Sequence, residues 1–163
     1  MKARISNIIV PTDTTGYSVG PAYNKMGWKS SPTHPLYFQD CRVSANNLLG
    51  LEGNGLPQFL WSLDIARVGI AALGVGLIQA CLDRALIYSG QRRAFGKTLN
   101  EFQSVQFSLA DMETAAYLGR LAVYHAGSLI QRDLPFSKEA AIAKLFTSEA
   151  ALKYGSRSAL FIG

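Results

Sequence analysis

The sequence of 163 residues predicts an α+β fold, in which a partial antiparallel β-domain precedes long antiparallel helices of an up-and-down four-helix-bundle type. Two observations predict this class. Up to about residue 51, short stretches rich in β-branched and aromatic residues are separated by Gly, Pro, Asn and Thr, as in strands joined by turns. After that point, apolar residues recur at helical spacing through three long segments. We therefore expect two domains, residues 1–51 and 52–163, with the bundle incomplete.

The β part contains three candidate strands. Residues 5–10 end at Pro11, and the other two candidates are Tyr17–Val19 and Leu36–Phe38, the latter continuing into residues 40–43. A sheet built from only about 50 residues needs partner strands to close its core. The sequence therefore predicts an incomplete, antiparallel β-domain.

The first long helix is predicted over residues 57–88, because Pro57 suits a first helical turn and no proline follows. Its expected buried stripe is Leu60, Leu63, the stem of Arg67, Ile70, Leu73, Leu77 and Leu82. Gly69, Gly74 and Gly76 each weaken a helix by about 1 kcal/mol relative to alanine. They indicate either close approach by another backbone or a ligand, or a loosely packed helix, and the sequence leaves both interpretations open.

A break over residues 89–99 separates this helix from a second one. Asn100 with Gln103 has the spacing of a capping box and predicts a helix over residues 100–131. Pro135 and Ser137 open a third helix that extends to about Phe161. The expected buried residues are Phe102, Val105, Leu109, Met112, Ala116, Leu118 and Leu121 in the second helix, and Ile142, Leu145, Phe146, Ala150, Leu152 and Leu160 in the third.

Composition and charge exclude several classes of function. The net charge of +5 is spread along the chain, which argues against nucleic acid as a partner and favours small anions. Two cysteines without Cys or His at ligand spacing predict neither a disulfide framework nor a metal site. The longest apolar run, residues 68–78, is shorter than the roughly 20 residues that cross a bilayer, so we expect a soluble intracellular protein with no membrane span.

The break between the first two helices carries the clearest chemistry. Arg92 and Arg93 stand next to Phe95 and Gly96 there. Arginine forks match phosphate oxygens, an aromatic ring packs on a flat ligand ring, and glycine allows close approach by the backbone. The alternative is a basic turn that neutralises the carboxyl end of a helix dipole. The residues by themselves leave both open.

The motif R-x-x-F-G-K over residues 92–97, followed by Q-x-x-Q over residues 103–106, resembles that of the acyl-CoA dehydrogenase family. The resemblance extends over almost the whole chain, including residues 40–50, 52–55, 63–67, 109–112, 143–144 and 150–155. It implies a flavoprotein that assembles as a homotetramer, a dimer of dimers, with FAD at a dimer interface. FAD would oxidise an acyl-CoA thioester to the trans-2-enoyl-CoA in β-oxidation, and an electron-transfer flavoprotein would accept the electrons. The expected location is the cytoplasm if the source is bacterial and the mitochondrial matrix if it is eukaryotic.

The resemblance also assigns roles to individual residues. Arg92 and Phe95 resemble the residues that reach the FAD of the neighbouring subunit, with Arg92 on the pyrophosphate and Gln103 close to the same cofactor. Asp64 and Arg67 resemble residues that contact the coenzyme A portion of the substrate. From their spacing alone, Asp64 and Arg67 predict only a surface ion pair worth about 0.2–0.5 kcal/mol.

The sequence departs from the family in ways that bear on catalysis. The family's N-terminal helical domain and earlier β segment have no counterpart, and its catalytic glutamate is expected beyond Gly163. A branch of the family carries that glutamate on the first long helix, where this sequence has Ala66. Leu160 stands where many members have a glutamine that touches FAD. We therefore expect no catalytic residue and no activity in this chain alone, the alternative being a non-catalytic assembly module that supplies Arg92 to a partner subunit.

Overall fold

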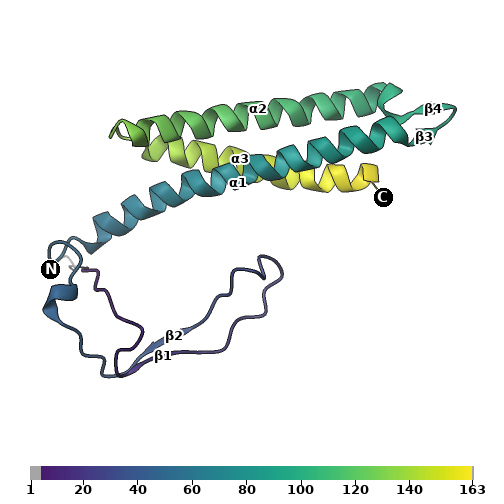
Figure 1. The fold of residues 1–163 in the computed structure, drawn as a ribbon. Coiled ribbons are helices and arrows are strands. Elements are labelled where there is room, and N and C mark those ends of the chain that lie inside the picture. Colours follow the sequence, from purple (N-terminus) through teal and green to yellow (C-terminus); the bar gives the residue numbers. More distant parts are fainter. Residues whose placement is uncertain (1–4, 163) are drawn as a thin grey trace. The chain divides into compact units, whose positions relative to one another are not determined.

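The computed structural model describes the backbone of residues 5–162 and the side chains as far as Ser158. It contains two compact units, Met1–Phe59 and Leu60–Gly163 (Figure 1). The elements are β1 (Tyr17–Val19), β2 (Leu36–Phe38), η1 (Ala45–Asn47), α1 (Gly55–Gln91), β3 (Arg93–Ala94), β4 (Lys97–Thr98), η2 (Leu99–Glu101), α2 (Gln103–Gln131) and α3 (Ser137–Ile162). The predicted α+β class is confirmed. The division into domains 1–51 and 52–163 stays a prediction.

The first unit is built around one short antiparallel pair. β1 and β2 pair in register from Tyr17 opposite Phe38 to the other end of both strands, and the two rings lie 5.4 Å apart. The strand predicted over residues 5–10 is wrong, since this segment makes only isolated bridges, from Ile5 and Ile8. The chain that it faces turns at η1 and again at Gly53 (φ 80°), so no continuous ladder forms there.

The helix α1 is longer than predicted at both ends. It continues through Ser89 and Gly90, where we expected a break, because Ser89 is buried and its hydroxyl donates to the Leu86 carbonyl at 3.1 Å. The remainder of the predicted break is a β-hairpin, β3 paired with β4. Periodicity did not indicate this hairpin because each of its strands has only two residues.

The predicted cap of the second helix is also wrong. Asn100 lies inside the 3-10 turn η2, and the capping box is formed two positions earlier, by Thr98 with Glu101. The Thr98 N–H donates to the Glu101 carboxylate at 2.6 Å. The interposed turn delays the start of α2 to Gln103, which follows Phe102 without a side-chain cap.

The helical core is made of smaller residues than the sequence predicted. α1, α2 and α3 lie side by side and share one buried cluster, in which five of eleven members are alanine (Figure 1). Burial is confirmed for Leu82, Val105, Leu109, Met112, Ala116 and Ala150. It is wrong for Leu60, Ile70, Leu73, Leu77, Leu118, Leu121, Ile142, Leu145, Phe146 and Leu152, which are exposed. α1 is apolar on both sides, so its periodicity does not select the packed side, and the small side chains allow the closer approach.

One helix crossing has no room for a side chain. A Cβ added to Gly74 on α1 would lie 2.9 Å from the Cβ of Thr147 on α3, and one added to Gly119 on α2 would lie 3.1 Å from the Thr147 methyl group. Close approach is therefore the reason for Gly74. Gly69 and Gly76 have open space instead, so the three glycines of this helix do not share one explanation.

By length and composition, α1 is the one helix in the described part of the chain that is apolar enough to cross a membrane. The 18-residue window that meets this criterion has a mean hydropathy of 1.9 and is 22% buried. Within the bundle, Gln79 of this helix accepts a hydrogen bond from Arg120 of α2 at 2.8 Å. Polar and apolar contacts to α2 and α3 thus place α1 as a helix of the bundle.

Candidate functional site

The β3–β4 hairpin presents an aromatic side chain at its tip. Phe95 and Gly96 form the turn with φ values of 50° and 83°, and two central residues with positive φ are typical of a type I′ turn. Glycine adopts this region freely, whereas for a bulky side chain such as Phe95 it costs about 1–2 kcal/mol. The Phe95 ring is 97% exposed. The tip therefore holds an exposed aromatic ring in a backbone conformation that is unfavourable for this side chain.

The two adjacent arginines of this hairpin have different surroundings. Arg93 donates from Nη2 to the Gly96 carbonyl at 2.8 Å, across the turn. The Arg92 backbone joins the hairpin to the helix, since its N–H donates to Tyr88 at 2.8 Å and its carbonyl accepts from Leu99 at 2.9 Å. Within the described residues, the exposed Arg92 guanidinium has no hydrogen bond or ion pair. Arg92 is therefore the arginine whose five donors remain available to an anion.

Phe102 supports the hairpin from the side of the bundle. The Lys97 amine lies 4.2 Å from the centre of the Phe102 ring, and the Phe95 and Phe102 rings meet edge to face at 6.4 Å. Phe102 itself packs against the buried cluster of the helices. Gln103, one residue further on, is exposed at the start of α2. The structure thus brings Arg92, Phe95 and the neighbourhood of Gln103 to one end of α1, while the support from Phe102 and Lys97 was missed. The aromatic residue directly before Gln103 was the available signal.

The capping box makes this hairpin sensitive to acid. Hydrogen bonds from the Thr98 hydroxyl and then the Thr98 N–H hold the pKa of the Glu101 carboxyl below its ordinary value of 4.5, and the charges of Arg93 and Lys97 act in the same direction. Because the folded pKa is the lower one, the contribution of Glu101 is complete above the unfolded pKa and is lost as pH falls through the folded pKa.

We therefore expect the Thr98 amide resonance to move between pH 6 and pH 3, with a midpoint below 4.5. Glu101→Gln should abolish this titration, and Glu113→Gln, which removes an exposed carboxylate elsewhere on α2, should preserve it. A midpoint at or above 4.5 in the unchanged protein would contradict the assignment.

Asp64 and Arg67 lie at the other end of the helical unit. Asp64 is buried, and its two carboxylate oxygens accept hydrogen bonds from Arg67 Nη1 and from the Ser137 hydroxyl. The carboxylate therefore ties α1 to the first residue of α3, which is more than the surface pair that spacing alone predicts. Arg67 remains partly exposed, with 41% of its side-chain surface accessible. Ala66, beside it, is exposed and has no group that could accept a proton.

Asp64→Ala is expected to lower the free energy of unfolding by about 1–3 kcal/mol, because it leaves the Arg67 and Ser137 donors without their shared acceptor. Urea unfolding followed by circular dichroism measures this. Glu113→Ala is the matched control, since an exposed carboxylate on a helix should change stability by no more than about 0.5 kcal/mol. Equal stabilities of the two variants would show that the Asp64 contacts contribute nothing.

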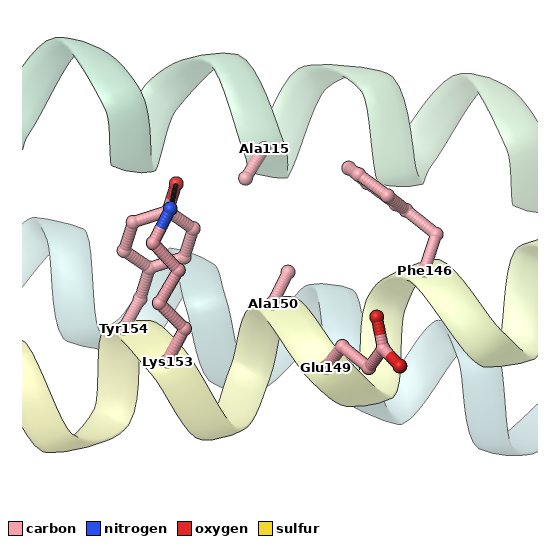
Figure 2. Close-up of a pocket in the computed structure, with 6 residues that line it drawn as sticks. All are labelled: Ala115, Phe146, Glu149, Ala150, Lys153 and Tyr154. Carbon is pink, nitrogen blue, oxygen red and sulfur yellow. Dashed lines mark hydrogen bonds between the residues drawn. The ribbon is translucent and has the colours of Figure 1, made fainter.

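A separate groove lies between α2 and α3. Its volume is about 200 Å³, and its lining residues are Ala115, Phe146, Glu149, Ala150, Lys153 and Tyr154 (Figure 2). The Lys153 amine and the Tyr154 hydroxyl lie 3.3 Å apart at one end. None of the predicted site residues lines this groove. The side chain of Leu160, which we expected to occupy a cofactor-contact position, lies outside the described residues.

Comparisons with known proteins agree on one family. The profile described as acyl-CoA dehydrogenase, C-terminal domain, matches residues 53–163. The chain is 48% identical over 149 residues to the probable acyl-CoA dehydrogenase YngJ of Bacillus subtilis, covering 91% of this chain and 39% of that protein. It is 41% identical to the mitochondrial short-chain specific acyl-CoA dehydrogenase of Rattus norvegicus, covering 98% of this chain and 39% of that one.

The same similarity is found among solved structures. The butyryl-CoA dehydrogenase of Megasphaera elsdenii superposes with a TM-score of 0.93 at 39% identity, covering 97% of this chain and 41% of that chain. The chain thus spans about two-fifths of the length of the relatives that it matches, which come from bacteria and from mitochondria.

Proposed function

Since the chain belongs to the acyl-CoA dehydrogenase family, we propose that it is part of an FAD-dependent oxidoreductase that converts acyl-CoA thioesters to trans-2-enoyl-CoA. The observation that carries the proposal is the pair formed by the exposed Phe95 ring and the Arg92 guanidinium, which has no partner in the described part of the chain. A guanidinium fork fits a pyrophosphate, and a projecting aromatic ring fits a flat heterocycle. FAD, when bound, would supply the acceptor for the hydride that leaves the β-carbon of the substrate.

The separation of the two predicted sites supports sharing between subunits. Asp64 and the end of α1 at Gln91 are 27 residues apart on one continuous helix, which at about 1.5 Å per residue is about 40 Å (Figure 1). Arg92 therefore lies far from Asp64 and Arg67 of the same chain. We propose that Arg92, Phe95 and Gln103 serve the FAD of a neighbouring copy in a homotetramer.

We propose that Asp64 and Arg67 serve the substrate together, with Asp64 holding Arg67 and Arg67 binding the substrate. The buried Asp64 carboxylate holds the Arg67 guanidinium by one nitrogen, so the remaining donors of Arg67 point to a defined place. Those donors suit the anionic coenzyme A portion of an acyl-CoA. Asp64, whose two oxygens accept from Arg67 and Ser137, would orient Arg67.

The base that removes the α-proton is proposed to come from outside the described residues. That proton is too weakly acidic to leave without a positioned base, and Ala66 offers only a methyl group beside Arg67. We therefore propose that the chain by itself does not turn over acyl-CoA. An electron-transfer flavoprotein is the proposed acceptor of the electrons, and the proposed location is the bacterial cytoplasm or the mitochondrial matrix.

A second candidate function is a non-catalytic assembly module. The exposed side of α1 favours it, because this side forms a shallow apolar groove of about 460 Å³ lined by Gly69, Ala72, Leu73, Gly76, Leu77 and Ala80. In this case the chain would supply Arg92 to the FAD of a partner subunit without housing a reaction of its own.

A segment exchange tests the first proposal. The aligned part of the Megasphaera elsdenii butyryl-CoA dehydrogenase is replaced by this chain, and the purified chimera is examined for flavin absorption before and after anaerobic addition of butyryl-CoA. We expect bound flavin that bleaches, and no bleaching when the chain alone is given FAD and butyryl-CoA. A folded chimera that retains flavin without bleaching would leave only the assembly module. Bleaching by the chain alone would contradict the proposed need for an external base.

A further inference from the structure

We propose that Arg93 is a positioning residue that closes the β3–β4 turn and thereby holds Phe95 and Arg92 ready for their ligand. This inference rests on the proposed cofactor role of Arg92 and Phe95. The observation behind it is the hydrogen bond from Arg93 Nη2 to the Gly96 carbonyl, 2.8 Å long, which bridges the two sides of the tip.

The hairpin needs such a brace because its backbone pairing is minimal. Only two residue pairs form the ladder, Arg93 opposite Thr98 and Ala94 opposite Lys97. An isolated hairpin is marginally stable in water even when its strands are longer. Phe95 adds a cost, since its φ of 50° is unfavourable for a bulky side chain. Without further contacts, the tip would exchange among other conformations.

Side chains supply these contacts at two levels. Near the bundle, the Phe102 ring receives the Lys97 amine on its face and the edge of Phe95, which fixes one side of the hairpin to the helices. At the tip, Arg93 binds the carbonyl of Gly96, the second central residue of the turn. A loop held in its binding conformation before the ligand arrives loses less entropy on binding. Arg93 therefore contributes to affinity through the turn, while Arg92 contributes through direct contact.

The test compares Arg93→Gln with Arg84→Gln, which removes an equal charge from an exposed arginine of α1 that has no hydrogen bond or ion pair among the described residues. Amide exchange at Leu99, whose N–H donates to the Arg92 carbonyl at 2.9 Å, reports opening of the hairpin. We expect Arg93→Gln to speed this exchange about 5–10-fold, the loss of one hydrogen bond, and Arg84→Gln to leave it unchanged.

A second pair of variants, both carrying Phe95→Asn, tests whether Arg93 acts through the turn. Phe95→Asn creates Asn-Gly, the pair that best fits a type I′ turn, so the turn should then form without help. In that background, we expect Arg93→Gln to change the Leu99 exchange rate by less than about twofold. An equal effect in both backgrounds, or an equal effect of Arg84→Gln, would overturn the proposal.

The link to the cofactor is measured separately. FAD is titrated into the apo form of the butyryl-CoA dehydrogenase chimera, and the affinity is read from the absorption of the bound flavin. Arg93→Gln is expected to weaken FAD binding several-fold, and unchanged affinity despite a loosened hairpin would overturn the positioning role. If FAD does not bind the folded chimera at all, the proposed cofactor role fails, while the exchange experiment still decides the role of Arg93.

Discussion

Replacing Gly74 by valine is expected to lower the free energy of unfolding by about 1–3 kcal/mol, the cost of overpacking a well-packed core. A Cβ at this position would meet the Thr147 Cβ at 2.9 Å and the Thr147 carbonyl oxygen at 3.0 Å. The carbonyl belongs to the α3 backbone, so it cannot turn aside as a flexible side chain would. The helices would have to separate where all three are closest, and urea unfolding followed by circular dichroism measures the loss.

Two neighbouring glycines provide the matched controls. Gly69→Ala and Gly76→Ala place a methyl group in open space, and each should raise the free energy of unfolding by up to about 1 kcal/mol through helix propensity. Substitutions at Gly74 and Gly76, two residues apart on one helix, are thus expected to change the free energy of unfolding in opposite directions. A Gly74→Val chain as stable as the original would show that the crossing is looser than described.

Arg92→Ala is expected to weaken FAD binding by about 10–100-fold. Hydrogen bonds to a charged partner are worth about 1.5–3 kcal/mol, and about 1.4 kcal/mol corresponds to a factor of ten. The stability of the chain should remain within about 0.5 kcal/mol, because the exposed guanidinium has no partner among the described residues. Titration of FAD into the apo form of the butyryl-CoA dehydrogenase chimera, followed by the absorption of the bound flavin, gives the affinity.

Arg84→Ala is the control for charge, since it removes a guanidinium from the exposed surface of α1 at a distance from the hairpin. If both substitutions weakened FAD binding equally, the effect would be the overall charge of the chain and Arg92 would have no specific role. Salt should distinguish the two explanations in the same way. An effect of overall charge on FAD binding should be screened by salt, whereas a direct contact from Arg92 should be screened much less.

Local sequence signals were sufficient for the main elements of the fold. The pair β1–β2 and the third helix were predicted at or close to their observed bounds, and the second helix was predicted within three residues of its start. Turn residues and unbroken apolar periodicity act over a few positions, so the sequence displays them directly. The motif over residues 92–97 likewise drew attention to the turn that holds Arg92 and Phe95, although the hairpin was not predicted.

The packed side of each helix was decided only by the tertiary structure. Leu73 and Leu77 are larger and more apolar than Ala71, yet Ala71 is buried and the two leucines are exposed. α1 is apolar on both sides, so burial depends on which side allows the closest approach of α2 and α3. The closeness of this approach depends on all three helices together, so it cannot be predicted from the sequence of any one of them.

The same distinction applies to the candidate site. The amino-acid sequence indicated which residues are candidates for the chemistry, because guanidinium, phenyl and glycine at this spacing suit a phosphate-bearing ligand. It did not determine that Arg93 is bound to Gly96 while the Arg92 guanidinium has no partner among the described residues, nor that Asp64 binds Ser137. The contact of Arg93 with Gly96 spans a turn, and that of Ser137 with Asp64 joins residues 73 positions apart. Both form only once the hairpin and the helix bundle have brought the partners within hydrogen-bonding distance.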